Sequence, residues 1–434
     1  MGFILKCEKQ TPLHMNHYDI LIIGGGTAGI TVAAQLRLKD KNLKIAIIEP
    51  SEKHYYQPAW TLVGAGTFDF EKTIRKEADY IPKGVTWIKD YATDILPEAN
   101  TVKTQKSGEC TYDYLVVAPG LVMAPELIPG LKEAIDKGVV CSNYTDPKHT
   151  WEVLKNFKGG NAIFTQPTTP IKCGGAPQKI MYLAEHYLRK KGIREKSNVI
   201  FATPGSVIFG VKEFAKTLNK IIIDRDIVLK TFYAPVKIDA EKQEITFRYM
   251  HSDFAQCAQT LTGKIGEEIT GESEIKMKFD MLHLAPPQQA PEFIRNSEVS
   301  LKEGPNKGWV DVDINTLQHK RFPNIFALGD VAALPTAKTG AAVRKQAPVV
   351  VGNILHLLKT KTLANKKYEG YSSCPLVTGY GKMVLAEFKY DNVRDSDPMI
   401  STFVDTTKEQ YSMWLLKKYV LPVMYWDMML KGKA

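Results

Sequence analysis

Short apolar runs alternate with segments of helical periodicity along most of this chain. The first run, 18–23, ends in a glycine-rich turn, and a helical pattern then extends to Arg37. A second apolar run follows at 44–48. Strands that alternate with helices in this way predict a parallel sheet with helices on its faces.

The same alternation recurs in the middle of the chain and again near its end. The late copy is an apolar segment, 323–330, followed by a helical pattern at 340–358. The middle copy predicts strands at 161–165, 198–202 and 227–233, with helices at 178–191 and 211–223, and then a meander that ends at 280–287. We therefore expect two units of the same α/β type within one chain.

The glycine turn after the first strand reads Gly24-x-Gly26-x-x-Gly29. The first glycine permits the tight turn, the second lets the backbone approach a pyrophosphate, and the third lets helix and strand pack closely. Glu49 ends the second strand, 20 residues after Gly29 (49 − 29), which is the usual place for a carboxylate on the adenosine ribose. With both strands and the helix in place, the motif predicts a dinucleotide site that also includes the neighbouring residues Thr27, Ala28 and Pro50.

The predicted fold class is α/β, with two Rossmann-like dinucleotide-binding domains of the FAD/NAD-linked reductase type and a C-terminal amphipathic membrane-binding region. The expected divisions are an N-terminal extension at 1–17, an FAD-binding domain at 18–130 and 301–365, a second Rossmann-like domain at 131–300, and a C-terminal region at 366–434.

Three further segments are candidates for contact with a flavin. His54 to Trp60, which includes Gln57 and Pro58, reads as an aromatic loop that either packs against the ring or fills the core. A strand from Cys110 closes in the turn Ala118-Pro119-Gly120. In a flavoprotein with two such domains, Asp330 of the Gly329-Asp330 turn would accept hydrogen bonds from the ribityl chain of FAD; the alternative is a capped turn.

Cys173 stands between a strand and a helix in the middle block. A helix N-terminus stabilises an anion, and neighbouring Lys172 adds a positive charge, so the thiolate should form easily. The other interpretation is a small residue in a tight turn. Pro167 and Pro170 occupy the place where glycines would cradle NADH, which argues against an ordinary nicotinamide site.

The C-terminal region carries a second candidate thiol, Cys374, in a Ser/Pro/Gly turn with flanks that look exposed. Beyond it, 411–433 is rich in Trp, Tyr, Met and Leu with interspersed lysines. We expect two short amphipathic helices, broken at Pro422, that lie in a membrane interface. The alternatives are a docked helix pair or a dimer seam.

Composition and charge exclude several other classes of protein. The chain has 434 residues, 44% of them hydrophobic, and a net charge of +10, but it shows no basic helix or aromatic platform typical of nucleic-acid binding. Neither a secretory signal nor a mitochondrial presequence is evident at the N-terminus, and no apolar run is long enough to span a bilayer. The six cysteines show no CxxC or zinc spacing: Cys7, Cys110, Cys141, Cys173, Cys257 and Cys374.

Several motifs together resemble the sulfide:quinone oxidoreductases, in the branch of the mitochondrial enzymes and their bacterial relatives. They cover almost the whole chain from Tyr18 and read Ile22-Ile-Gly-Gly-Gly-Thr-Ala-Gly-Ile, His54-Tyr-Tyr-Gln-Pro-Ala-Trp, Cys173-Gly-Gly-Ala-Pro-Gln-Lys, Leu334-Pro-Thr-Ala-Lys-Thr and Ser373-Cys-Pro-Leu-Val-Thr-Gly-Tyr. The resemblance implies a monotopic flavoprotein with FAD, a redox pair formed by Cys173 and Cys374, and a quinone pocket that opens toward the membrane. Many members have a further cysteine near the position of Ala118-Pro119-Gly120; this chain has none there, and the context of Cys141 does not match.

The resemblance also implies a mechanism. Hydrosulfide attacks a Cys173–Cys374 bridge, with or without an additional sulfur, and leaves Cys374 as persulfide and Cys173 as thiolate. Two electrons reach FAD and then ubiquinone or menaquinone, while a thiol, sulfite or polysulfide takes the sulfur. Lys338 and Lys417 match lysines of the family; they either steady negative charge near flavin and quinone or are solvated surface lysines. The expected location is the cytoplasmic face of a bacterial inner membrane, or else the mitochondrial inner membrane, with a homo-oligomer as an open alternative.

Two rival functions remain at this stage. A type II NADH:quinone dehydrogenase would share the fold, but it would require a glycine-rich cradle in the middle domain. A non-catalytic peripheral membrane protein that binds FAD only structurally would tolerate loss of Cys173.

Overall fold

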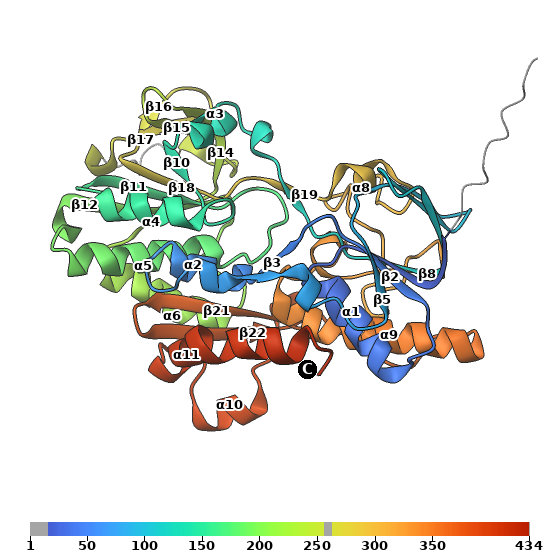
Figure 1. Cartoon of the computed structure of the whole chain (residues 1–434). Helices are drawn as coiled ribbons and strands as arrows, with labels where there is room; N and C mark the ends of the chain where they lie inside the picture. The colour runs from blue at the N-terminus through green and yellow to red at the C-terminus, as the bar shows by residue number, and fades with distance from the viewer. Residues whose placement is uncertain (1–15, 256–262, 434) are drawn as a thin grey trace, which may run out of the picture.

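The computed structural model describes residues 16–255 and 263–433. Two α/β units lie side by side, and the C-terminal strands and helices lie across one side of both, as Figure 1 shows. The predicted N-terminal extension lies outside the described residues except for its last two, Asn16 and His17, which already belong to the first strand; Cys7 and Cys257 also lie outside.

The first unit is built on a sheet with the strand order β5-β2-β1-β8-β7-β6, to which β20 adds beside β8. Its central strands are parallel and almost fully buried, as their continuous apolar sequences predict. The helices α1 (Thr27–Lys39) and α9 (Gly340–Thr360) pack against each other beside it. The strands are β1 (Asn16–Ile23), β2 (Ile45–Ile48), β5 (Val85–Ile88), β6 (Ala92–Leu96), β7 (Thr101–Thr104), β8 (Glu109–Val117) and β20 (Ile325–Ala327).

The second unit contains a five-stranded parallel sheet with the order β10-β18-β11-β12-β13. The strands are β10 (Val140–Cys141), β11 (Gly160–Thr165), β12 (Ser197–Thr203), β13 (Val228–Thr231) and β18 (Met281–Leu284), and the helices are α4 (Pro147–Asn156), α5 (Ala176–Lys190) and α6 (Lys212–Asp224). The alternation of strands and helices predicted for this block is confirmed.

One predicted strand, 227–233, is wrong in extent. β13 ends at Thr231, and Phe232 has a φ of 64°, a left-handed conformation that interrupts an extended strand. The chain then enters a separate antiparallel sheet made of β14 (Tyr233–Asp239), β15 (Glu244–Tyr249), β16 (Glu268–Ile269) and β17 (Glu274–Lys278).

A pair of short strands connects the two units. β9 (Val122–Met123) runs outward and β19 (Gln288–Gln289) returns, and the two pair antiparallel between the units (Figure 1). Short helices flank these crossings: α3 (Leu131–Asp136) on the second unit and α8 (Glu292–Asn296) on the first.

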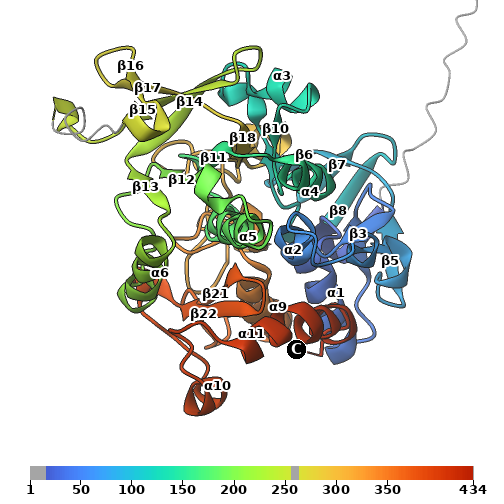
Figure 2. The ribbon, with the colours of Figure 1, turned by 90° about the vertical axis from the view of Figure 1, so that its left-hand side faces the viewer.

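The C-terminal region begins with a hairpin of β21 (Ser372–Gly379) and β22 (Lys382–Phe388), which packs against α5. A short helix, α10 (Pro398–Phe403), projects away from both sheets, as Figure 2 shows from the side. The last helical segment comprises α11 (Tyr411–Leu415), a π-helical stretch (Leu416–Val420), α12 (Leu421–Val423) and a second π-helical stretch (Met424–Met429).

The predicted break at Pro422 is wrong, because helical structure continues through it. Widened π turns on both sides change the hydrogen-bond pattern around the missing proline N–H. Trp414, Tyr425 and Trp426 face the protein interior and are buried rather than lying at a membrane interface. Within residues 16–255 and 263–433, no helix has the length and apolar character needed to cross a bilayer.

Candidate active site

The glycine turn between β1 and α1 has the geometry of a dinucleotide cradle. Gly24 has a φ of 97°, and a Cβ there would collide with the carbonyl of Ala118. A Cβ on Gly29 would collide with the carbonyl of Gly24, so helix and strand approach as closely as the third glycine allows. A Cβ on Gly26 would meet open space. Gly26 is the N-cap residue of α1, and no side chain accepts a hydrogen bond there, so the N-terminus of α1 is free to receive phosphate.

Glu49 lies at the end of β2 beside this turn, followed by half-buried Pro50. Its carboxylate accepts a hydrogen bond from the Gly25 N–H at 2.7 Å and another from the Ser51 N–H at 2.7 Å. Burial raises the pKa of Glu49, and these two hydrogen bonds oppose that effect. Each carboxylate oxygen keeps a second lone pair, which suits it to hydroxyls of a ribose.

Other predicted cofactor residues border the same turn. Ala118 is buried under Gly24, while Pro119 and Gly120 are half-buried, and Gly120 has a φ of 75° with nothing close to its Cβ position. Ala28, in the first turn of α1, approaches Gly329, where a Cβ would lie 3.2 Å from the Ala28 Cβ.

The segment from His54 to Trp60 is not the loop that composition predicts. His54 and Tyr55 belong to a small antiparallel ladder between β3 (Lys53–Tyr55) and β4 (Ile74–Lys76), and Trp60 begins helix α2 (Trp60–Val63). Pro58 suits the single helical turn, Gln57–Ala59, between them. The half-buried Trp60 indole N–H points toward the Thr73 hydroxyl at 3.4 Å.

Two cysteines from distant parts of the sequence meet at the start of α5. Cys173 precedes α5, whose N-cap is Gly175, and Cys374 lies in β21. Their Sγ atoms are 3.9 Å apart although 201 residues separate them in sequence, and no disulfide joins the described cysteines. A Cβ on Gly175 would collide with the Cys374 sulfur, so only glycine lets the strand approach the helix start so closely.

The surroundings of Cys374 differ from the prediction. It was expected in an exposed turn, but it sits within a strand and is only 2% exposed. Pro375 and Gly379 are the reason for the error: both are turn residues, yet Pro375 is accommodated in a two-stranded ladder and Gly379 lies at its bulged end.

Lys179, which sequence analysis did not single out, is the principal charge partner of Cys173. Its Nζ donates a hydrogen bond to the Cys173 Sγ at 3.1 Å from inside the protein, where the lysine is 3% exposed. The residue ends the quoted Cys173-Gly-Gly-Ala-Pro-Gln-Lys motif, on the first turn of α5, and that position was the available signal. Adjacent Lys172, which was expected to supply the charge, instead donates to the Gln57 side chain at 2.6 Å.

The pKa values of the two thiols are shifted in opposite directions. A hydrogen bond from Cys374 lowers the pKa of Cys173, and the charges of Lys179 and Lys417 lower it further, against the effect of burial. The same interaction with Cys173, together with burial, raises the pKa of Cys374. Cys173 is therefore the thiolate of the pair and Cys374 is the thiol.

The loop that carries Cys173 is held in a strained conformation. Cys173 has a φ of 92°, which is rare for a residue with a side chain. The Tyr144 hydroxyl, another contact that sequence analysis missed, lies 3.2 Å from the Lys172 carbonyl and 3.4 Å from that of Cys173. These hydrogen bonds fix the backbone that presents the sulfur.

Lys338 and Lys417 are buried, so their interpretation as solvated surface lysines is wrong. Lys338 lies 4.1 Å above the Trp309 ring and donates to the Ala332 carbonyl at 2.9 Å, and burial lowers its pKa to about 8. Lys417 donates to the Pro58 carbonyl at 2.8 Å, and burial, then the charge of Lys179, lowers its pKa to about 7.

Asp330 completes a cluster of charged groups around Cys173. The backbones of Lys172 and Lys338 pair in an isolated parallel β-bridge, which brings the Cys173 loop against the segment that follows Asp330. Burial raises the pKa of Asp330, while the charges of Lys172 and Lys338 lower it. With four lysines, one carboxylate and one thiolate, the cluster is suited to anions.

Cys141 stands apart from this chemistry. It is 1% exposed in β10, its S–H points to the Leu282 carbonyl at 3.4 Å, and burial raises its pKa to about 12. Within the part of the chain that the structure describes, no group of His, Cys, Asp or Glu residues has the arrangement of a metal site.

Comparison with known proteins places the chain among its relatives. A family model described as pyridine nucleotide-disulphide oxidoreductase matches residues 18–155. The mitochondrial sulfide:quinone oxidoreductase of Dictyostelium discoideum is 43% identical, over 99% of this chain and 89% of the relative, and that of Mus musculus is 41% identical, over 96% and 87%. This chain belongs to the sulfide:quinone oxidoreductase family.

The fold agrees with that assignment. The crystal structure of the sulfide:quinone oxidoreductase from Aquifex aeolicus superposes with a TM-score of 0.73, at 22% identity, over 94% of this chain and 91% of that one. The family is one of FAD-binding flavoproteins. The open Gly26 cradle, the uncapped start of α1 and the placement of Glu49 fit that cofactor.

Proposed function

We propose that this protein oxidises hydrogen sulfide to the sulfane level through Cys173 and Cys374 and passes two electrons, through FAD, to a membrane quinone. The observation that carries the proposal is the contact between the two sulfur atoms, 3.9 Å apart, with Lys179 3.1 Å from Cys173. The names of the mouse and Dictyostelium relatives support the choice of sulfide and quinone as substrates.

The chemistry begins with the two cysteines joined as a disulfide. Hydrosulfide attacks the Cys374 sulfur, so that one S–S bond forms as the other breaks, leaving Cys374 as a persulfide and Cys173 as a thiolate. Cys173 is the better leaving group because Lys179 and the start of α5 stabilise its anion.

The second half of the cycle regenerates the bridge. A nucleophilic acceptor, which we propose is a thiol, sulfite or polysulfide, takes the outer sulfur of the persulfide and leaves Cys374 as a thiolate. The two thiolates then rejoin and release two electrons. Bound FAD supplies the two-electron acceptor that links this oxidation to ubiquinone or menaquinone.

Specific residues would hold the cofactor during this cycle. We propose that Gly24, Gly26, Gly29 and the first turn of α1, including Thr27 and Ala28, bind the pyrophosphate, and that Glu49 binds the adenosine ribose. Asp330 would bind the ribityl chain. Lys338 and Lys417, both buried, would stabilise negative charge near the ring. Gln57, which accepts a hydrogen bond from Lys172, and Pro58, which accepts one from Lys417, would lie close to it.

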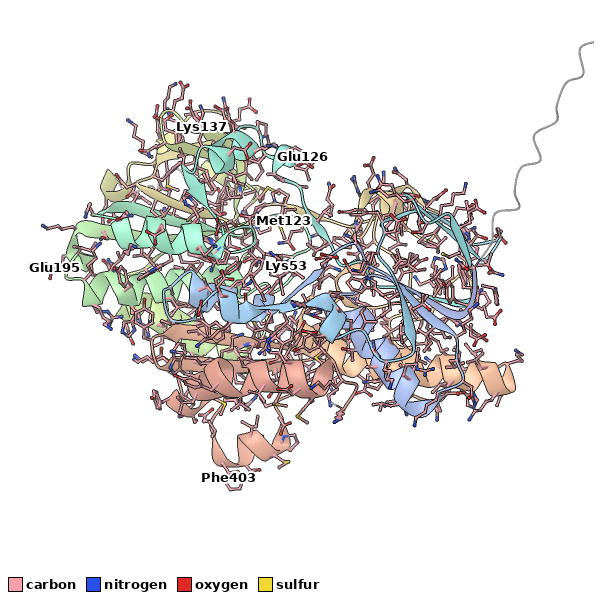
Figure 3. All side chains as sticks on the ribbon, in the orientation of Figure 1. Lys53, Met123, Glu126, Lys137, Glu195 and Phe403 are labelled. Carbon is pink, nitrogen blue, oxygen red and sulfur yellow. The ribbon has the colours of Figure 1, made fainter. Side chains whose placement is uncertain are left out.

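A membrane surface is the proposed location of the quinone. Exposed apolar side chains gather on α10 and on the outer face of the last helical segment: Met399 is 81% and Phe403 is 87% exposed, and Tyr419, Val420 and Val423 are also exposed. Figure 3 shows Phe403 at the outer end of α10, pointing away from the protein. An exposed apolar patch of this kind marks an interaction site, and the basic side chain of Lys418 suits it to anionic lipid.

This membrane proposal has a direct test. We expect the variant Met399→Ser/Phe403→Ser to lose most of its co-sedimentation with vesicles that contain anionic lipid, while its flavin spectrum is unchanged. The variant Leu38→Ser, at an exposed apolar position on α1, serves as the matched control. Equal vesicle binding by all three proteins would contradict the assignment of this surface.

Sulfide-dependent reduction of a short-chain quinone tests the proposed function. We expect activity with sulfide and sulfite, and a loss of at least about 100-fold in Cys173→Ser and in Cys374→Ser, because each removes a sulfur that must form a bond. Cys110→Ser, at a buried cysteine in β8, is the control and should retain activity. Quinone reduction by NADH but not by sulfide would support the rival dehydrogenase instead.

A further inference from the structure

A buried chain of hydrogen bonds joins the C-terminal helical segment to the glycine turn of the FAD site. The Tyr425 hydroxyl lies 2.7 Å from the Thr27 Oγ1 and 2.6 Å from the His54 Nε2. The other ring nitrogen of His54 lies 3.0 Å from the Glu77 Oε2. Thr27 is the first residue of α1, so the chain reaches the helix turn that faces the pyrophosphate.

The chain is shielded from water and its geometry is fixed by packing. Tyr425 is 6% exposed and its ring lies 4.8 Å from that of Tyr56 and 5.0 Å from that of Trp426. Burial raises the pKa of Tyr425, so its hydroxyl stays protonated at neutral pH. A carboxylate at Glu77 only accepts, so Nδ1 of His54 donates to it, and in a neutral ring Nε2 then accepts from Tyr425.

The far end of the chain also touches the cradle. Glu77 is 2% exposed, and its second oxygen, Oε1, has no hydrogen-bond partner among the described residues. That oxygen lies 2.6 Å from where a Cβ on Gly25 would be, and the same Cβ would lie 2.7 Å from the Cγ of Glu49. Both ends of the chain therefore contact the turn that holds the dinucleotide, one at Thr27 and one behind Gly25.

The C-terminal segment is also in close contact with α1. A Cβ on Gly432 would lie 2.9 Å from backbone atoms of Ala34 and Gln35, so the end of the segment lies directly on the helix. The C-terminus is drawn beside α1 in Figure 1. The Tyr425 hydroxyl is thus placed by a segment that cannot shift without moving α1.

We propose that Tyr425 is a positioning residue for FAD: through its hydroxyl, the C-terminal helical segment holds the Thr27 side chain and the first turn of α1 in the geometry that binds the pyrophosphate. The inference concerns cofactor retention and is independent of which substrates the enzyme oxidises. Without the hydroxyl, Thr27 and His54 lose a shared partner in the interior, where an unpaired polar group is costly.

The test is the rate at which the purified holoenzyme releases FAD, followed by the fluorescence of free flavin after dilution. We expect Tyr425→Phe, which keeps the ring and removes only the hydroxyl, to release FAD about tenfold faster than wild type. Tyr419→Phe, on the exposed face of the same segment, is the matched control and should release FAD at the wild-type rate.

Two further measurements separate positioning from simple loss of packing. The thermal midpoint of FAD-free protein should differ little between Tyr425→Phe and Tyr419→Phe, whereas the extra stabilisation on adding FAD should shrink in Tyr425→Phe alone. Thr27→Val should also speed release, and the double variant should be no worse than the more severe single one. Unchanged release from Tyr425→Phe, or additive effects in the double variant, would overturn the proposal.

Discussion

Replacing Lys179 with methionine removes the cation nearest to the Cys173 thiolate and keeps a side chain of similar length. The ammonium now lies 3.1 Å from the sulfur, inside the protein. Without the ammonium, the burial of Cys173 disfavours the charged form of its sulfur and less charge opposes that effect. We therefore expect Cys173 to become a protonated thiol at neutral pH in the reduced enzyme.

The size of the effect follows from the hydrogen bond that is lost. Unit charges 3.1 Å apart attract by roughly 5 kcal/mol at an effective dielectric constant of about 20. Desolvation of the lysine cancels part of this, and hydrogen bonds to charged groups contribute about 1.5–3 kcal/mol net. At fixed pH, the thiolate fraction of Cys173 should fall roughly 10- to 100-fold.

The assay is the rate at which iodoacetamide alkylates Cys173 in the reduced protein, measured across pH by mass spectrometry of the peptide. In Lys179→Met the reactivity at pH 7 should fall by the same factor, and the pH at which Cys173 ionises should rise. Lys190→Met removes an exposed charge from the same helix and is the control. An alkylation profile of Lys179→Met that matches this control would refute the assignment of Lys179.

Three other substitutions test separate parts of the site. Burial lowers the pKa of Lys417 from 10.5 to about 7. Between these two pH values the unfolded chain binds more protons than the folded one, so the stability of the folded protein rises with pH. Lys417→Met should therefore raise the thermal midpoint of FAD-free protein by a few degrees at pH 7 and have no effect near pH 10.5. Gly29→Ala should yield protein without bound FAD, whereas Gly352→Ala, where a Cβ has free space inside α9, should bind FAD normally; the flavin spectrum decides. Cys141→Ala should keep wild-type sulfide oxidation, and a loss of activity would point to a third redox cysteine.

The elements that bind the dinucleotide could be predicted because their signals are local. The glycines of the first turn, the acid at the end of β2 and the apolar strands are each dictated by contacts within about 30 residues. The position of Cys173 before α5 was predicted for the same reason, since Pro177 and Gly192 mark the two ends of that helix.

Contacts between segments that are distant in the sequence could not be predicted from local patterns. Lys179 appears as an ordinary polar residue on a helix until β21 covers α5 and encloses it with Cys374. The burial of Cys374 depends on a strand ladder that tolerates Pro375, although proline is unfavourable in most strands. The Thr27–Tyr425 hydrogen bond spans 398 residues, and no local pattern reports it.

The C-terminal segment illustrates how composition alone can mislead. Its aromatic residues suggested a surface that lies in lipid, yet Trp414, Tyr425 and Trp426 pack into the protein core. The apolar residues that remain exposed are instead on α10 and on the outer side of the segment, for example Phe403 and Val423. When a helix has two apolar faces, only the tertiary structure shows which face packs into the protein and which stays exposed.

The central claim is that electrons from sulfide reach FAD only through the Cys173–Cys374 pair. The most direct measurement is anaerobic flavin absorbance after rapid mixing with sulfide, for wild type, Cys173→Ser and Cys374→Ser. The account predicts fast bleaching in the wild type, recovery on addition of quinone, and no fast bleaching in either variant. Bleaching at the wild-type rate in either variant, or bleaching by NADH and not by sulfide, would contradict it.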